Sequence, residues 1–352
     1  MSTLLHVVGA RPNFPKLAPV HRAAAARGID QVVVHTGQHY DEAMSDGFFR
    51  DLGIPAPTIN LEVGSASHAV QTARIMERFE RVLATPPSWV VVYGDVNSTV
   101  AATLVASKLG VRVAHVEAGL RSFDRTMPEE INRLVTDRLA DLLLTPSRDA
   151  DAQLLSEGEP ASKIRFVGNV MVDSLFHALP IAAASGTAAR LSADGTHAVV
   201  TLHRPSNVDN DARLRSIMDA LRGIAEGRPV LFPVHPRTRG RLDTLAIDTG
   251  RITLLPPLGY FEMVDLVRTA YVTITDSGGI QEETTALGVP CLTVRENTER
   301  PATITHGSNR LVPDPLELPQ LVAQARRAEV VRRPEGWDGQ AAERVVDALL
   351  SP

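Results

Sequence analysis

The chain has 352 residues, of which 44% are hydrophobic and 22% charged, an ordinary globular composition in a chain long enough for two domains. Its net charge of −5 argues against the broad basic surface that binds nucleic acid, so any phosphate binding must be local. The single cysteine, Cys291, excludes an intrachain disulfide and suits a reducing compartment.

Short apolar strands alternate with helical segments through the first half of the chain. The expected strands are 4–8, 31–35, 89–93, 111–116, 142–145 and 164–167. Helices are expected over 15–27, 98–109 and 129–139, and Gly28 ends the first of them. This alternation indicates βαβ units and a mostly parallel sheet.

A second series of the same kind follows residues 182–196, which are rich in Ala, Ser, Gly and Thr and read as a linker. Its expected strands are 198–202, 229–234, 252–255, 271–275 and 291–294. The predicted fold is therefore α/β, with two Rossmann-like doubly wound domains over residues 1–170 and 171–338. The last segment, 339–352, contains a helix that could pack back on the first domain. Ligands of such sheets bind beyond the carboxyl ends of the strands, so we expect the two domains to face a cleft that holds the site.

The chain carries no recognisable targeting or membrane segment. The apolar stretch at 4–8 is too short for an export signal and no basic region precedes it. A membrane span would need about 18 apolar residues in a row, and the sequence has no such run. We therefore expect a cytoplasmic protein without a membrane partner.

Polar residues follow the first strand at the start of a helix. Gly9 would allow a tight turn, and Arg11 and Lys16 would project near the free N–H groups of the helix. Two cations at a helix N-terminus suit an anionic ligand such as a phosphate. A surface salt bridge explains the same residues equally well.

Three carboxylates fall where strands end or a helix begins. Asp95 and Glu117 each follow a predicted strand, and Glu129 comes directly after Pro128. Asp95 could simply cap the next helix, and Glu129 could pair with Arg133 one turn later. If all three meet at one edge of the sheet, acid–base chemistry becomes the better explanation, because crowded carboxylates are costly.

The second half repeats this pattern with histidines and glycines. His203 and His235 each follow a strand and each has an arginine nearby, which suits phosphate contact or general acid catalysis. Another strand runs through Ser277-Gly278-Gly279 into a helix, where close backbone approach and free N–H groups suit a diphosphate. Glu283, one turn later, could bind both hydroxyls of a ribose.

Several common cofactor sites have no support in the sequence. It contains neither G-x-G-x-x-G nor G-x-x-x-x-G-K-[ST], which removes the main evidence for a dinucleotide or P-loop site. It also has no His, Cys and Asp cluster with metal-ligand spacing. We therefore expect no metal and no cofactor.

Seven short motifs then occur in the order found in one enzyme family. They are Gly9-Ala10-Arg11-Pro12, Gln38-His39-Tyr40-Asp41, Gly94-Asp95-Val96-Asn97-Ser98-Thr99, Val116-Glu117-Ala118-Gly119-Leu120-Arg121, Pro128-Glu129-Glu130-Ile131-Asn132-Arg133, Asp276-Ser277-Gly278-Gly279 and Thr298-Glu299-Arg300-Pro301. Each is weak alone, but the ordered set spans nearly the whole chain and resembles the non-hydrolysing UDP-N-acetylglucosamine 2-epimerases.

The resemblance implies a homodimer with a GT-B-type fold that interconverts UDP-N-acetylglucosamine and UDP-N-acetylmannosamine without metal or nicotinamide. It also implies a route that eliminates UDP to leave 2-acetamidoglucal and then adds UDP back. Carried over position by position, the catalytic residues are Asp95, Glu117, Glu129 and His203. The residues carried over for substrate binding are Arg11, Lys16, Arg133, His235, Ser277, Gly278, Gly279 and Glu283.

One segment departs from the family pattern, and other functions stay open. Many members carry His-Arg-Arg-Glu-Asn where this chain has His203-Arg204-Pro205-Ser206-Asn207, in a segment that helps form a second, activating UDP-sugar site. The alternative functions are an epimerase of another UDP-sugar such as a 2,3-diacetamido-uronic acid, a GT-B glycosyltransferase, a hydrolysing epimerase, and a non-catalytic UDP-sugar sensor.

Overall fold

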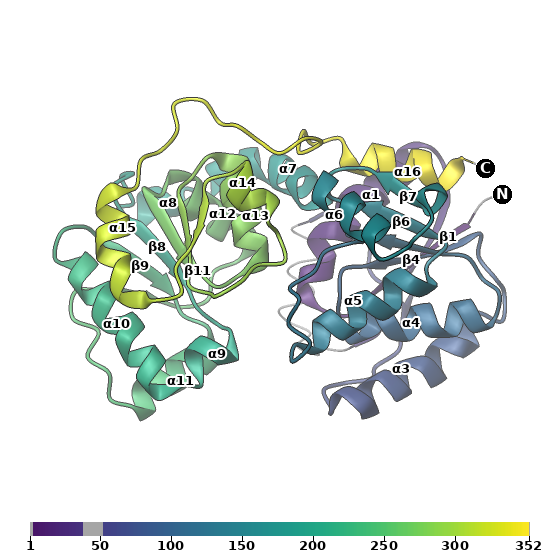
Figure 1. Ribbon diagram of the computed structural model, residues 1–352, viewed down its shortest axis with the longest axis horizontal. Helices are drawn as coiled ribbons and strands as arrows, with labels where there is room; N and C mark the ends of the chain where they lie inside the picture. The colour runs from purple at the N-terminus through teal and green to yellow at the C-terminus, as the bar shows by residue number, and fades with distance from the viewer. Residues whose placement is uncertain (1–2, 38–51, 352) are drawn as a thin grey trace. The chain divides into compact units, whose positions relative to one another are not determined.

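The computed structural model describes residues 3–37 and 52–351 and divides into two compact units (Figure 1). Unit 1 consists of Met1–Ser174 and Glu335–Pro352, and unit 2 of Leu175–Pro334. The motif Gln38-His39-Tyr40-Asp41 lies outside the described residues. Within the described part of the chain, no helix combines the length and the apolar character needed to cross a membrane.

Unit 1 is built on a seven-stranded parallel sheet in the order β3-β2-β1-β4-β5-β6-β7. Its strands are β1 (Thr3–Val8), β2 (Asp30–His35), β3 (Ile59–Asn60), β4 (Trp89–Tyr93), β5 (Val113–Val116), β6 (Leu142–Thr145) and β7 (Ile164–Phe166). Its α-helices are α1 (Phe14–Ala26), α3 (His68–Val82), α4 (Asn97–Lys108), α5 (Pro128–Leu139), α6 (Arg148–Ser156) and α16 (Ala341–Leu350), with 3-10 turns η1 (Arg11–Asn13) and η2 (Ala161–Lys163).

Unit 2 is built on a six-stranded parallel sheet in the order β10-β9-β8-β11-β12-β13. Its strands are β8 (Ala198–Thr201), β9 (Val230–Pro233), β10 (Thr253–Leu255), β11 (Val272–Thr275), β12 (Cys291–Thr293) and β13 (Asn309–Leu311). Its helices are α8 (Thr187–Arg190), α9 (Pro205–Val208), α10 (Asp211–Ala225), α11 (Pro236–Thr244), α12 (Tyr260–Thr269), α13 (Gly278–Leu287), α14 (Ala302–Thr305), η3 (Pro315–Glu317) and α15 (Leu318–Gln324). Helix α7 (Val170–Ser185) begins in unit 1 and ends in unit 2.

Each sheet is covered by helices and has its own apolar core. The central strands β4, β5 and β6 are buried along their whole length, as expected of parallel strands packed on both faces. One core cluster gathers residues such as Ile75, Phe79 and Val92 in unit 1, and a separate one gathers Ile217, Phe232 and Ile274 in unit 2. The predicted fold class, two Rossmann-like doubly wound domains, is confirmed.

Three features differ from the sequence prediction or go beyond it. The expected linker at 182–196 is largely helical, because α7 continues to Ser185 and α8 covers Thr187–Arg190. The edge strands β3 and β13 and the helix α3 were not predicted. Helix α16, whose position the sequence left open, packs on α1 of unit 1, where Figure 1 shows the yellow C-terminal helix beside the purple first helix.

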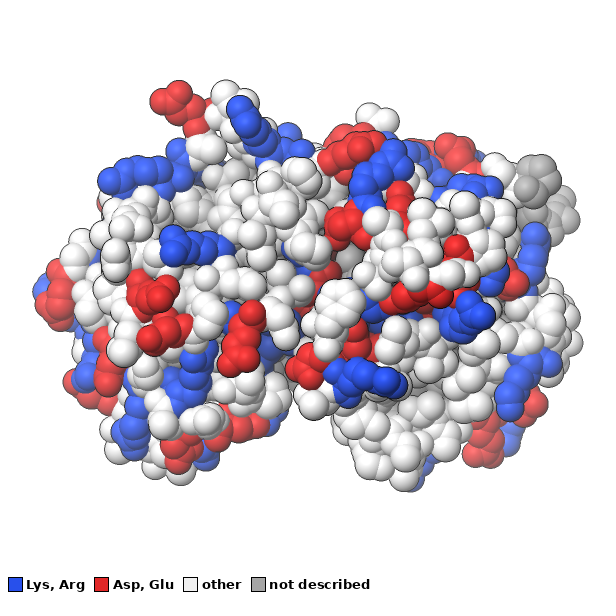
Figure 2. Space-filling view, in the orientation of Figure 1, with Lys and Arg blue, Asp and Glu red and all other residues white. Residues whose placement is uncertain are grey.

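Charged side chains of both signs are distributed over the face seen in Figure 2. Blue and red groups alternate across each unit there, and the described residues form no extended basic area on that face. This agrees with the net charge of −5 and with phosphate binding confined to local sites.

Candidate active site

The rim of unit 1 consists of the turns that follow β4 and β5, together with the start of α5. Tyr93 of β4 pairs with Val116 of β5, so the chain leaves both strands at the same edge of the sheet. Asp95 follows Gly94, and Glu117 follows Val116 directly. Glu117 has φ of 74°, a left-handed conformation that costs a non-glycine residue about 1–2 kcal/mol. Such strain at a carboxylate marks this rim as a functional candidate.

Glu117 is paired with a buried lysine. The Nζ of Lys16, on α1, lies 2.5 Å from Oε2 of Glu117, and the two side chains are 6% and 5% exposed. A Cβ built on Gly94 would lie 2.7 Å from the same Nζ, so glycine at this position makes room for the ammonium group. Lys16, expected to meet a phosphate, has a carboxylate partner in the unit 1 rim.

Asp95 is paired with Arg133 of α5. One Nη of Arg133 bonds Asp95, while its Nε and other Nη reach Glu130 at 3.0 and 2.6 Å. Asp95 does not cap α4, because the N-cap residue of that helix is Val96. The cap that the sequence allowed as an alternative is therefore wrong.

Glu130, rather than Glu129, provides the helical ion pair with Arg133. Glu130 is 2% exposed and accepts hydrogen bonds from the backbone N–H groups of Ser122 and Phe123, both at 3.0 Å. Burial alone would raise the pKa of Glu130, but these N–H groups and Arg133 hold it below its usual value. Glu129 lies in the first turn of α5, near the rim, and is partly exposed. Among the described residues, the ion pair with Arg133 that the i, i+4 spacing suggested for Glu129 is made by Glu130 instead.

The loop before α1 is shaped by a buried asparagine that the sequence analysis did not single out. Asn13 Oδ1 accepts from the N–H groups of Gly9 and Ala10 at 3.1 Å, and its Nδ2 donates to the Tyr93 carbonyl at 2.9 Å. Gly9 is required for close packing rather than for a turn, because a Cβ there would lie 2.0 Å from Ser98 Oγ. Arg11 is the first residue of η1 and is partly exposed.

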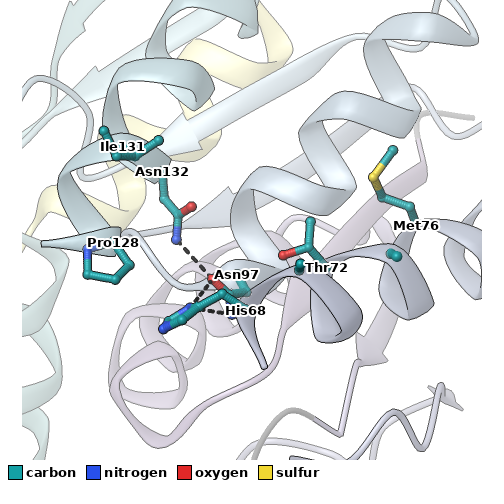
Figure 3. Close-up of a pocket in the computed structure, with 9 residues that line it drawn as sticks. His68, Thr72, Met76, Asn97, Pro128, Ile131 and Asn132 are labelled. Atoms are coloured by element: carbon teal, nitrogen blue, oxygen red, sulfur yellow. Dashed lines mark hydrogen bonds between the residues drawn. The ribbon is translucent and has the colours of Figure 1, made fainter. Parts of the chain in front are cut away.

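A groove of about 520 Å³ lies beside the unit 1 rim between α3 and α5 (Figure 3). Its floor includes Asn97, which bonds His68, and Asn132, which bonds the Asp95 carbonyl at 2.9 Å. Figure 3 shows these three polar side chains pointing toward one another, with Met76 farther along α3. The groove therefore shares with the rim the residues that hold the Asp95 turn.

The rim of unit 2 consists of the turns after β8 and β11 and the start of α13. Thr201 pairs with Thr275, so His203 and Asp276 leave neighbouring strands at one edge. Nδ1 of His203 lies 3.0 Å from Asp276 Oδ1, and the histidine side chain is 48% exposed while Asp276 is fully buried. Asp276 thus fixes one ring nitrogen and leaves Nε2 of His203 toward solvent.

Asp276 also organises the backbone of this turn. It accepts from the N–H groups of His203 and Arg204 at 3.1 and 3.0 Å and from Asn207 Nδ2 at 3.1 Å. Burial alone would raise the pKa of Asp276, but His203 and these N–H donors hold it below its usual value. The sequence gives no sign that Asp276 pairs with His203, because the two positions are 73 apart in the chain.

Helix α13 begins at the predicted glycines and lies beside a cationic group. Ser277 is its N-cap residue, with Oγ accepting from Ile280 N at 3.5 Å, and Gly278 is its first residue. A Cβ on Gly278 would lie 2.5 Å from Nη1 of Arg300, whose Nε is 3.0 Å from Glu282. Free N–H groups and a guanidinium together favour an anionic ligand. Arg300 is a residue of this rim that the predicted site did not include.

Glu283 is buried in the second turn of α13. It is 5% exposed, and burial, together with its neighbour Glu282, raises its pKa to about 8. His235, the other predicted residue of unit 2, is exposed and caps α11 by accepting from Arg237 N at 3.2 Å.

Within each unit, the predicted residues fall at the carboxyl ends of the parallel strands. Unit 1 brings together Asp95, Glu117, Lys16 and Arg133, while unit 2 places His203 on the strand next to Ser277. Among the described residues, no group of three or more His, Cys, Asp or Glu side chains is arranged to hold a metal ion.

Comparison with known proteins identifies the family. The model of the UDP-N-acetylglucosamine 2-epimerase family matches residues 21–350. The chain belongs to the UDP-N-acetylglucosamine 2-epimerase family. This confirms the resemblance inferred from the ordered motifs and the assignment to the isomerases.

Individual relatives support the assignment along the whole chain. The UDP-N-acetylglucosamine 2-epimerase of Methanocaldococcus jannaschii is 41% identical over 97% of both chains. Its crystal structure with UDP-GlcNAc and UDP superposes with a TM-score of 0.90 over 99% of both chains. A UDP-2,3-diacetamido-2,3-dideoxy-D-glucuronate 2-epimerase of Pseudomonas aeruginosa is 44% identical over 88% of each chain.

Proposed function

We propose that the chain interconverts UDP-N-acetylglucosamine and UDP-N-acetylmannosamine by eliminating and re-adding UDP. The observation that carries the proposal is the pair of carboxylates Asp95 and Glu117, which leave neighbouring strands at one edge and are each matched to a cation. The Methanocaldococcus relative, whose solved structure contains UDP-GlcNAc and UDP, supports this choice of substrate.

The proposed chemistry requires acid–base groups and no redox step. The C2 proton is not next to a carbonyl, so enolisation is not available. A base removes the C2 proton, a C1–C2 double bond forms, and the C1–O bond breaks with its electron pair leaving on UDP. In the reverse step, the diphosphate oxygen attacks C1 of the 2-acetamidoglucal and an acid protonates C2 from the opposite face.

The two rims supply different groups for this chemistry. Asp95, Glu117 and Glu129 provide the acid–base chemistry in unit 1, where Arg133 orients Asp95 and Lys16 orients Glu117. In unit 2, His203 assists departure and return of UDP, with Nδ1 fixed by Asp276. We assign the diphosphate and uridine contacts to Arg11, His235, Ser277, Gly278 and Gly279, and the ribose to Glu283.

A second substrate is favoured by one specific comparison. The Pseudomonas relative is named for a 2,3-diacetamido-glucuronate, which carries an acetamido group at C3 and a carboxylate at C6 in place of hydroxyl-bearing groups. The C2 chemistry is unchanged, so the same carboxylates would serve.

The family resemblance also leads us to propose a homodimer, which analytical ultracentrifugation would measure directly.

Proton NMR of the purified protein in D₂O tests the proposal. With UDP-N-acetylglucosamine, the expected result is a mixture of the two UDP-sugars with deuterium at C2. Deuterium exchange only with the diacetamido-uronate substrate would replace the first candidate by the second. Release of free N-acetylmannosamine and UDP would indicate a hydrolysing enzyme, and the absence of exchange in either sugar would contradict an epimerase.

A further inference from the structure

A buried ionic cluster lies under the unit 1 rim and is not part of the chemistry above. His115 is on β5 and fully buried, and Asp137 is on α5 and 1% exposed. Arg121, just beyond the β5 turn, is 5% exposed and completes the cluster with the carboxylate of Glu157. The buried charge of Arg121 is compensated by two carboxylates, those of Asp137 and Glu157, which is the condition under which ionic groups are tolerated in a protein interior.

Both ring nitrogens of His115 face hydrogen-bond acceptors. Nε2 lies 2.8 Å from the carbonyl oxygen of Gly94, which can only accept, so Nε2 carries a proton. Nδ1 lies 2.6 Å from Oδ1 of Asp137. Burial alone would raise the pKa of Asp137, but His115 and Arg121 hold it below its usual value. Both ring nitrogens of His115 are therefore engaged, and one proton lies between Nδ1 and Oδ1 of Asp137.

The second carboxylate oxygen of Asp137 extends the contact to the neighbouring turn. It accepts from Gly119 N at 3.1 Å and from Arg121 Nη1 at 2.7 Å. Arg121 is held in place by a bidentate bond to Glu157 at 2.8 and 2.7 Å. One hydrogen-bonded chain thus runs from the carbonyl of Gly94 to the N–H of Gly119.

These two backbone groups belong to the turns that carry the reacting carboxylates. Gly94 precedes Asp95, and Gly119 comes two residues after Glu117. Gly94, Glu117 and Gly119 have φ values of 62°, 74° and 83°, so both turns use left-handed backbone. Left-handed conformations at a non-glycine residue persist only when the surrounding structure imposes them.

We propose that the His115–Asp137 ion pair is a positioning device that joins the turn carrying Asp95 to the turn carrying Glu117 and sets the spacing of the two carboxylates. The inference rests on the proposed function of the same rim. His115 and Asp137 touch no reacting atom; they act through the backbone of Gly94 and Gly119.

Two substitutions at His115 separate the two hydrogen bonds. His115→Gln places an amide nitrogen near the position of Nε2 and keeps the bond to Gly94. His115→Asn places one near Nδ1 and keeps only the bond to Asp137. Since misplacing a reacting group by about 1 Å can cost about 100-fold in rate, we expect His115→Asn to lower kcat by about 10- to 100-fold with KM nearly unchanged. His115→Gln breaks the same chain at Asp137 instead of at Gly94, so it should lower kcat as well, again with KM nearly unchanged.

The kinetics are measured well below the melting temperature of each variant, so that loss of folded protein does not contribute. Arg138→Gln is the matched control on α5, since Arg138 is 69% exposed and its partner Glu159, at 2.7 Å, keeps Lys163 as a second cation. It should keep the wild-type kcat. If either His115 variant retains kcat within about twofold of the wild type, the contact between His115 and Asp137 is a core contact only and the proposal is wrong.

A second measurement does not depend on a stable His115 variant. In protein labelled with ¹⁵N-histidine, His115 should show N–H signals from both ring nitrogens at pH 7, and Asp137→Asn should abolish one of them and lower kcat. A single ring N–H in the wild type would show that His115 does not donate to both Gly94 and Asp137, and would overturn the proposal. If the wild-type protein fails to exchange C2 deuterium with either UDP-sugar, the proposed function fails and the positioning role falls with it, whereas the ¹⁵N spectrum still decides whether the ion pair exists.

Discussion

Asp95 and Glu117 in the unit 1 rim each combine a proposed catalytic role with an ion pair, and experiments can separate the two. Glu117 and Lys16 form a pair whose side chains are almost completely buried, while Asp95 is 26% exposed beside Arg133. Removing one member of a buried pair leaves an uncompensated charge, which costs about 3–5 kcal/mol, whereas a partly exposed pair contributes less. Loss of activity alone therefore does not identify a catalytic carboxylate here.

Glu117→Gln should lose both turnover and stability, and a second substitution should restore only the stability. We expect kcat to fall by at least about 100-fold, the usual effect of removing an acid–base group, with UDP affinity largely kept. Adding Lys16→Met removes the stranded ammonium and should recover most of the free energy of unfolding without recovering kcat. Urea unfolding, turnover and calorimetric UDP titration check the three quantities. A double variant that regained turnover would mean that Glu117 serves only to neutralise Lys16.

Asp95→Asn provides the comparison for a carboxylate that is itself more exposed. The amide can still accept from Arg133, so the free energy of unfolding should change by less than about 1 kcal/mol. Turnover should fall by at least about 100-fold if Asp95 exchanges protons with the substrate. Near-normal turnover of a folded Asp95→Asn protein would remove Asp95 from the mechanism.

Asp276 should affect turnover only through His203. Asparagine at 276 keeps an acceptor for the backbone N–H groups but loses the charge that orients and stabilises the histidine ring, as in the aspartate partner of serine-protease triads, where the loss reaches about 10⁴-fold. We expect Asp276→Asn to lower kcat, and His203→Asn to cost little more when combined with it, since residues acting as a unit are not additive. Fully additive losses in kcat would show that the two residues act independently.

Some strands and helices could be predicted from the sequence alone, and others could not. The central strands were predictable because parallel strands buried on both faces appear as continuous apolar runs. The edge strand Ile59–Asn60 has only two residues and gives no such pattern. Helix α3 did carry a usable signal, since its buried residues Gln71, Ile75 and Phe79 recur every four positions.

The sequence predicts those site residues that directly follow a strand. It does not predict which side chains form ion pairs with each other. Residues that follow parallel strands must gather at one edge, which correctly brings Asp95 to the same rim as Glu117. Nothing in the sequence links Lys16 to Glu117, or His115 to Asp137, because these contacts join different elements across the fold. Sequence spacing assigned Arg133 to Glu129, whereas the rotation of α5 directs it to Glu130 and Asp95.

The attachment of α16 to unit 1 depends on a residue of another helix. Asp173, on α7, accepts from the first N–H groups of α16, those of Ala341 and Ala342, at 3.2 and 2.7 Å. Asp173→Ala should destabilise the protein by about 1–2 kcal/mol, the usual cost of losing a helix cap, and increase hydrogen exchange in α16. Asp173→Asn keeps an acceptor and should have little effect at pH 7. Equal losses in both variants would show that the charge, and not the cap, holds the helix.

The pH dependence of the whole molecule follows from its buried ionisable groups. Burial lowers the pKa of His6 to about 3, so this group adds stability as pH rises towards its unfolded value near 6.5. Burial raises the pKa of Asp173 to about 6 and of Glu283 to about 8, so each binds more protons in the folded state and stability falls as pH rises through these values. Of these three groups, only Glu283 still titrates above about pH 6.5.

Between pH 6.5 and 8, the free protein should therefore lose stability through Glu283, by at most about 1.4 kcal/mol per pH unit. The ionised form is the one that accepts two ribose hydroxyls, so UDP should bind more tightly over the same interval and release protons as it binds. Urea unfolding and calorimetry in buffers of different ionisation enthalpy measure the two effects, with Glu283→Gln as the variant that should lack both. If wild type and variant show the same pH slopes, Glu283 does not titrate in this interval. If only the slope in UDP affinity is shared, Glu283 titrates in the free protein but is not the ribose ligand.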